Sequence, residues 1–174
     1  GDEKDGGYIL QIGHTSVVDL ELWGMGPEVA FDALYAYDTA WFNGDTDTFT
    51  YWVTDFSAHS SEARGWFLDL AEEDLIANLH VTHGENSSDA ASPGWAEYFS
   101  NIPESHQSSL GMLRGAEDYW GSLGHSLRLD GLESGYNDNV RTRAIVLHGA
   151  EYARAEFVAT YGLAGLSWGC PAVD

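Results

Sequence analysis

The segment Ala144-Ile-Val-Leu-His-Gly149 joins four apolar residues to a histidine and a glycine, and Ser167-Trp-Gly-Cys-Pro171 contains the only cysteine, 22 positions after His148. The apolar residues predict a buried strand that ends at His148, and the glycine before Cys170 predicts a tight turn. This arrangement can bring a nucleophile and its base together. An unperturbed thiol, with a pKa of about 8.5, is only a few per cent thiolate at neutral pH and benefits from a neighbouring imidazole. The spacing alone leaves open that Cys170 is a small buried apolar residue.

Segments rich in β-branched and aromatic residues flank these two motifs and predict a mostly β domain, of the α+β class, with peripheral helices. A helix is expected from Pro27 to Asn43-Gly44, because proline suits a first helical position and the apolar residues share one face. A second helix is expected between His148 and Gly162, and residues 84–106 predict a long surface loop. Strands are expected at residues 48–55, 65–70, 79–83, 108–113, 126–129 and 144–147, with a short turn at residues 71–74.

Length and composition predict one domain and argue against several classes of partner. The 174 residues are 44% hydrophobic, which is enough for one sizeable core. The formal charge of −21 repels phosphate backbones and anionic lipid surfaces, so nucleic acid and membrane-surface binding are not expected. No apolar run is long enough to cross a bilayer, and any export signal is expected to have been removed. We expect residues 1–26 to form a partly disordered lead and residues 27–174 to form the domain.

The remaining histidines and one arginine are candidates for binding rather than for metal chemistry. His80 and His83 lie three positions apart on an expected strand and would point to opposite faces, so no zinc site is expected. His83 stands at a strand end that opens the long loop, which places it near an active site. Ser126 and Arg128 alternate with leucines and face one side of their strand. Arg128 could bind a substrate carboxylate, and a structural ion pair is the equal alternative.

A series of short stretches in a fixed order extends these motifs over the chain from about Phe31 to Ala172. In this series the chain resembles the catalytic domain of the murein L,D-transpeptidases, in particular the second YkuD-like group. In the better-known branch a histidine precedes the Gly-Cys pair and an arginine follows closely, whereas this chain has Trp168 before it and Pro171-Ala172 after it. The matching stretches are residues 33–37, 50–56, 66–70, 81–84, 99–101, 107–111, 126–132, 137–139, 143–150 and 167–172.

The resemblance implies a β-sandwich or barrel catalytic fold, export to the periplasm or cell surface, and cysteine acyltransferase activity without a cofactor. Cys170 would be the nucleophile, and His148, followed by Gly149, would be the general base, oriented by a backbone or side-chain acceptor. The amides around Gly169 and Cys170 would bind the oxyanion. Residues expected to contact the substrate are His83, Ser126, Arg128, Ser167 and Trp168.

The substrate implied by the resemblance is a peptidoglycan stem peptide. The thiol would attack the carbonyl of the third residue of a tetrapeptide stem and expel the terminal D-alanine, and an amine of a second stem would then form a 3-3 crosslink. With water as acceptor, the protein would instead be an L,D-carboxypeptidase or a peptidase that cleaves crosslinks. A non-catalytic surface protein that keeps the fold as a binding or structural module is the alternative from another class. The sequence does not predict the oligomeric state.

Overall fold

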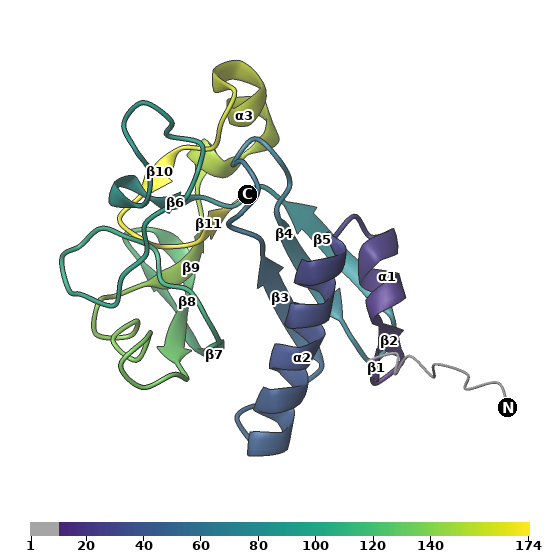
Figure 1. Ribbon diagram of the computed structural model, residues 1–174. Coiled ribbons are helices and arrows are strands. Elements are labelled where there is room, and N and C mark those ends of the chain that lie inside the picture. The colour runs from purple at the N-terminus through teal and green to yellow at the C-terminus, as the bar shows by residue number, and fades with distance from the viewer. Residues whose placement is uncertain (1–10) are drawn as a thin grey trace, which may run out of the picture. The chain divides into compact units, whose positions relative to one another are not determined.

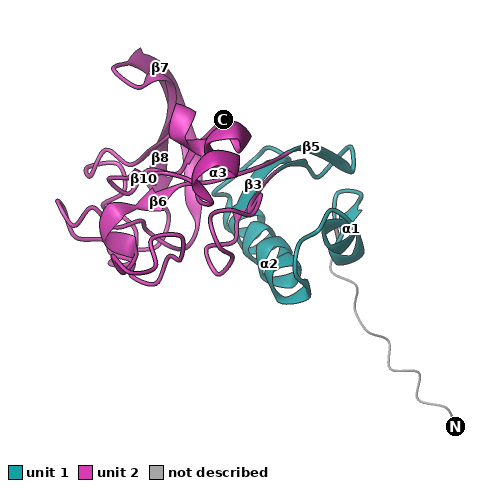
Figure 2. Ribbon diagram, turned by 90° about the horizontal axis from the view of Figure 1, so that it is seen from above, with its two compact units in different colours: residues 1–53, 67–77 teal, residues 54–66, 78–174 magenta. Residues whose placement is uncertain are grey.

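The computed structural model describes residues 11–174 and consists mostly of strands with few helices (Figure 1). This confirms the predicted mostly β, α+β class. The described residues group into two compact units. Unit 1 comprises residues 11–53 and 67–77, and unit 2 comprises residues 54–66 and 78–174 (Figure 2). The lead predicted for residues 1–26 overlaps unit 1, and its first ten residues lie outside the described part. None of the described helices is both long and apolar enough to span a membrane.

Unit 1 begins with two short strands and two helices: β1 (Gln11–Ile12), β2 (Thr15–Ser16), α1 (Val17–Leu22) and α2 (Pro27–Asn43). The sequence analysis did not predict α1, which starts at a reciprocal cap. The Ser16 hydroxyl accepts from the N–H of Asp19, and the Asp19 carboxylate accepts from the N–H of Ser16. The helix predicted from Pro27 is confirmed. It ends at Gly44, whose φ of 76° is the left-handed conformation common after helices.

The second part of unit 1 is a sheet in the order β3-β4-β5, built from β3 (Thr50–Thr54), β4 (Gly65–Asp69) and β5 (Asp74–Leu79). Most residues of each strand belong to unit 1, and the remaining ones belong to unit 2. The first two predicted strands and the short turn after them are confirmed. The strand predicted at residues 79–83 was wrong, because pairing starts at Asp74 and ends at Leu79. The alternation of β5 places Ile76 on its exposed side, 56% exposed, and this obscures the pattern in the sequence.

Unit 2 contains a sheet in the order β11-β9-β8-β7, built from β7 (Leu113–Gly121), β8 (Gly124–Gly131), β9 (Val146–Gly149) and β11 (Ala172–Val173). The first three strands pair antiparallel, and β11 runs parallel to β9. Ser126 lies opposite His148, and Leu127 lies opposite Leu147. The strand predicted at residues 126–129 is confirmed, and the one predicted at residues 144–147 is present but begins only at Val146 and ends at Gly149. This register places polar and apolar residues of β8 on opposite faces.

The rest of unit 2 is loops and short elements: β6 (His83–Gly84), β10 (Leu166–Ser167), η1 (Glu85–Ser87), η2 (Glu151–Ala153) and α3 (Ala155–Tyr161). Strands β6 and β10 pair in parallel. The predicted long loop is present, and it continues to residue 112. The strand predicted at residues 108–113 was wrong over most of its length, because the Ser108 N–H donates to the Ser87 hydroxyl instead of a strand partner. The helix expected after His148 begins only at Ala155, because His148 and Gly149 complete β9.

One apolar cluster of unit 2 lies beneath β8. Val140 is fully buried there with Leu129 and Ile145, and Leu113 and Leu127 pack against them. The leucines of β8 thus face this cluster, while Ser126 and Arg128 face the other side. The cluster holds the strand pair that carries the polar residues.

We expect Val140→Ala to lower the free energy of unfolding by about 2 kcal/mol, because it removes buried methyl groups and leaves a cavity. Val18→Ala is the matched control, since Val18 is 52% exposed and its loss should change stability by less than about 0.5 kcal/mol. Urea unfolding of both variants measures the two effects. Equal losses would contradict the assignment of Val140 to the core.

Candidate active site

The turn that carries Cys170 depends on a glycine and on a serine hydroxyl. Gly169 has a φ of 112°, which residues with a side chain rarely adopt, and a Cβ there would lie 2.7 Å from the carbonyl oxygen of Gln107. The Ser167 hydroxyl accepts from the N–H of Gly169 at 3.1 Å and donates to the carbonyl oxygen of Cys170 at 2.7 Å. The tight turn predicted at Gly169 is therefore present, and Ser167 closes it.

Two further hydroxyl groups, from segments distant in sequence, hold the carbonyl groups of this turn. Thr82 donates to the carbonyl oxygen of Cys170 at 3.1 Å and accepts from the N–H of Ala172 at 3.0 Å. Ser108 donates to the carbonyl oxygen of Gly169 at 3.3 Å. Both hydroxyl-bearing residues are buried. Because an unpaired buried polar group is costly, these bonds favour one conformation of the turn.

The Cys170 side chain is buried, with 8% of the residue exposed. Its sulfur lies 3.5 Å from the backbone nitrogen of Val146, which donates to it, and 3.7 Å from the carbonyl oxygen of Ala144, which can accept the S–H. Burial raises the pKa of the Cys170 thiol, while the Val146 N–H and the charge of Arg143 lower it. The resting group is a neutral thiol at neutral pH, so its ionisation depends on a base.

His148 is buried on β9, on the same side of the sheet as Ser126. Val146, which contacts the Cys170 sulfur, is two positions earlier on this strand. The His148 Nδ1 atom lies 2.9 Å from the carbonyl oxygen of Gly149. A carbonyl oxygen only accepts, so Nδ1 carries the proton of the neutral ring and Nε2 keeps a free lone pair. No hydrogen bond joins this ring to the sulfur within the described chain. Strand β9 relates the two groups, because it carries both His148 and the Val146 N–H that donates to the sulfur.

Ser126 and Arg128 face the same side of β8, as their alternation with leucines predicted. Ser126 is buried, and its hydroxyl donates to the carbonyl oxygen of Gly124 at 3.3 Å. The Arg128 guanidinium lies over the Tyr119 ring, 4.3 Å from its centroid, and Nε is 3.2 Å from the Glu117 carboxylate. These contacts correspond to the structural ion pair given as the alternative for Arg128, and a role for either residue in substrate binding stays a prediction.

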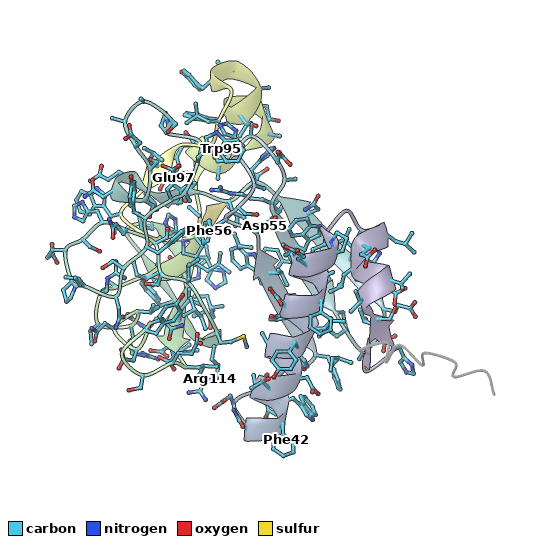
Figure 3. The ribbon with its side chains drawn as sticks, viewed as in Figure 1. Phe42, Asp55, Phe56, Trp95, Glu97 and Arg114 are labelled. Carbon is cyan, nitrogen blue, oxygen red and sulfur yellow. The ribbon has the colours of Figure 1, made fainter. Side chains whose placement is uncertain are left out.

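His83 is fully buried and belongs to a polar cluster around Arg64. The Arg64 guanidinium donates to His83 Nδ1 at 2.7 Å and to the carbonyl oxygen of Val81 at 2.8 Å. It lies 5.2 Å from the ring centroid of Phe56, which is labelled in Figure 3. Burial and then the Arg64 charge lower the pKa of His83 to about 4. His83 is therefore a neutral, buried residue that follows Thr82, whose hydroxyl bonds to the Cys170 turn. Its contact with substrate stays a prediction.

Trp168 is the exposed aromatic residue of the Cys170 turn, at 70% exposure. Its ring stacks on that of His106, with the centroids 4.8 Å apart and the planes 8° from parallel. The His106 Nδ1 atom lies 2.7 Å from the Glu85 carboxylate. His106, in the long loop after β6, thus covers one face of the Trp168 indole, which stands two positions before Cys170.

Comparison with known proteins assigns this arrangement to a family. Residues 25–174 match the family model described as L,D-transpeptidase catalytic domain. The chain belongs to this family. The match confirms the resemblance drawn from the sequence and spans both Cys170 and His148. No curated protein and no solved structure matches the chain. The family acts on peptidoglycan, which supports a function of the transpeptidase type.

In this L,D-transpeptidase domain, two residues near the thiol were missed as site residues by the sequence analysis. Arg143 appeared there only inside a matching stretch, and Tyr152 only as part of the helix expected between His148 and Gly162. The positive charge of Arg143 lowers the pKa of Cys170, and burial followed by the charge of Cys170 raises the pKa of Tyr152. Neither residue belongs to a periodic pattern that predicts a site. Among residues 11–174, no group of three or more His, Cys, Asp and Glu residues could hold a metal ion.

The buried, neutral state of His83 predicts a loss of stability in mild acid. The unfolded chain binds a proton on this histidine near pH 6.5, whereas the folded domain does so only near pH 4. The free energy of unfolding therefore falls as pH drops from about 6.5 towards about 4. We expect this histidine to contribute about 1 to 2 kcal/mol of the loss between about pH 7 and 5.

His83→Gln should reduce the fall in stability between these pH values, because glutamine can accept from Arg64 but does not titrate. Urea unfolding at several pH values measures the difference. His125→Gln, which replaces an exposed histidine, is the matched control. Parallel pH profiles for the wild type and His83→Gln would contradict the buried neutral state of His83.

Proposed function

We propose that this L,D-transpeptidase domain is a cysteine acyltransferase that joins peptidoglycan stem peptides through a thioester on Cys170. The observation that carries the proposal is the 2.9 Å hydrogen bond between His148 Nδ1 and the Gly149 carbonyl oxygen, because it leaves Nε2 free to accept a proton. The family match over residues 25–174 supports the substrate class. We place the protein in the periplasm or at the cell surface, where peptidoglycan is found.

In the proposed acylation, His148 Nε2 takes the proton of the Cys170 thiol, and the sulfur attacks the carbonyl carbon of the third residue of a tetrapeptide stem. The C–N bond to the terminal D-alanine then breaks. The leaving amine takes the proton from the imidazolium, and a thioester to the sulfur remains. Because burial raises the pKa of the thiol, proton transfer to a base is essential for this step.

In the proposed second step, the amine of another stem attacks the thioester carbon. The amine gives a proton to His148, the C–S bond breaks, and the sulfur of Cys170 regains a proton from the imidazolium. The product is a 3-3 crosslink. Water in place of the amine would give a trimmed tripeptide stem and a carboxylic acid, which is the hydrolytic alternative.

The N–H of Cys170 is the oxyanion donor that we propose for both steps. The N–H of Gly169 donates to the Ser167 hydroxyl, so of the two expected amides we propose only that of Cys170 for this role. No hydrogen bond within residues 11–174 uses the N–H of Cys170. A fixed amide donor that is free in the resting state can stabilise the charge that develops in the transition state.

Cys170→Ala should abolish turnover of a tetrapeptide stem, and His148→Asn should reduce it by about 10² to 10⁴-fold, because the first removes the nucleophile and the second removes the base. Mass spectrometry of the products separates stem dimers, which appear only with transfer, from trimmed stems. Arg154→Gln is the control, since Arg154 pairs with the exposed carboxylate of Asp174. Full turnover by Cys170→Ala would contradict the proposal, and trimmed stems without dimers would establish hydrolysis.

The exposed indole of Trp168 is proposed to contact the bound stem. Trp168→Ala should raise KM by about 3- to 10-fold, the size expected for losing an aromatic contact. The effect on kcat should be smaller, because the contact is similar in the bound substrate and in the transition state. Trp168→Phe should keep most of the affinity, since it retains a ring that can stack on His106. An unchanged KM in Trp168→Ala would contradict this role.

A further inference from the structure

Arg143 binds the loop beside Cys170 through four neutral acceptors. Its Nη1 atom donates to the carbonyl oxygen of Ser100 at 2.5 Å and to the Ser109 hydroxyl at 2.7 Å. Its Nη2 atom donates to the Ser105 hydroxyl at 3.0 Å and to the carbonyl oxygen of Gln107 at 2.6 Å. These bonds satisfy the guanidinium geometrically without cancelling its charge, because hydroxyl and carbonyl groups carry no net charge.

Four other arginines of the described chain differ from Arg143, because each of them pairs with one or two carboxylates. These are Arg114, Arg128, Arg141 and Arg154. In a chain of net charge −21, an arginine without a carboxylate partner is an exception. Besides the fully buried Arg64, which bonds to carbonyl oxygens and to His83, Arg143 is the only one among the described residues. Its field is screened less by solvent than that of a surface charge, so it acts on neighbouring groups.

The neighbouring ionisable group is the thiol. Burial raises the pKa of Cys170 and the charge of Arg143 opposes this rise, while burial lowers the pKa of Arg143 and the charge of Cys170 opposes that fall. The same arginine also fixes Gln107, whose carbonyl oxygen lies against Gly169 so closely that a Cβ there would be 2.7 Å away. Arg143 is thus linked to the thiol by charge and to its turn by packing. Tyr152 is the other titratable residue whose pKa responds to Cys170.

We propose that Arg143 is a positioning residue whose uncompensated positive charge stabilises the Cys170 thiolate formed during the reaction. This inference rests on the proposed function and adds to it, because the imidazole of His148 accepts the proton while the guanidinium favours the resulting anion. The residue acts through Cys170 and needs no contact with the stem peptide. Experiments can separate the effect of the Arg143 charge on the thiol from the effect of its hydrogen bonds to the loop.

The test measures thiolate formation directly. Cys170 is the only cysteine, so alkylation by iodoacetamide, followed by intact mass, reports the reactivity of this one thiol as a function of pH. Arg143→Gln should move the midpoint of the profile upwards and slow alkylation at neutral pH by about 3- to 10-fold. Arg143→Lys keeps the charge and should keep the rate within about twofold of the wild type.

Two further variants separate charge from structure. The double variant Ser105→Ala and Ser109→Ala removes two of the bonds of Arg143 but leaves its charge. It should lower the thermal midpoint of unfolding and leave the pH profile of alkylation unchanged. Arg141→Gln removes an equal charge that Glu117 and Asp130 compensate, and it should also leave the profile unchanged.

An unshifted profile in Arg143→Gln would overturn the inference, and so would equal shifts in Arg143→Gln and Arg143→Lys. If Arg143→Gln does not fold, wild-type profiles in Arg143→Lys and in the double serine variant support the charge role, and shifts in both contradict it. Product analysis with the stem peptide is scored separately. A shifted profile without stem products would refute the proposed function alone, whereas stem products with an unshifted profile would refute only the role of Arg143.

Discussion

Three buried hydroxyl groups hold the turn of Cys170, and the position of the thiol depends on them. Thr82, Ser108 and Ser167 come from separate segments, and all three donate to carbonyl oxygens of Gly169 or Cys170. A buried turn cannot use water for these groups, so its carbonyls need partners from the chain. Loss of the Ser108 hydroxyl would leave the Gly169 carbonyl oxygen unpaired, at a cost of about 1 to 3 kcal/mol, whereas the Cys170 carbonyl oxygen has two donors. The same bonds restrict the sulfur before substrate binds, which reduces the ordering needed later.

Electrostatics near the thiol differ from those of the surrounding surface. The chain has a net charge of −21, and carboxylates close to a sulfur disfavour its ionisation. Near Cys170, however, the fixed groups that lower its pKa are the N–H of Val146 and the guanidinium of Arg143. The acidic surface and this local positive potential are compatible, because exposed charges are screened by salt whereas partly buried ones are screened much less. A strongly acidic protein can therefore keep two groups beside the thiol that oppose the rise in its pKa caused by burial.

The sequence predicted the parts of the fold and site that local patterns determine. The helix from Pro27, the strand around Ser126 and the turn at Gly169 each follow from periodicity or from a glycine that must adopt a positive φ. The position of strand β5 was predicted wrongly because the apolar residue Ile76 is exposed, so the pattern of apolar residues in the sequence did not match the pattern of buried residues. The role of Arg143 was not predictable, because it arises from bonds to a loop some forty positions earlier in the chain. Such contacts exist only after folding.

The residue before Gly169 shows how a departure from the family pattern changes the site. The better-known branch has a histidine where this chain has Trp168, so the titratable ring at that position is lost. An imidazole is nevertheless close, because His106 stacks on the indole and holds Glu85 at 2.7 Å. Its Nδ1 atom is engaged by that carboxylate, which favours an anchoring role over proton transfer to the thiol. Proton transfer in this domain then depends on His148, whose Nδ1 atom is fixed by the adjacent Gly149 carbonyl.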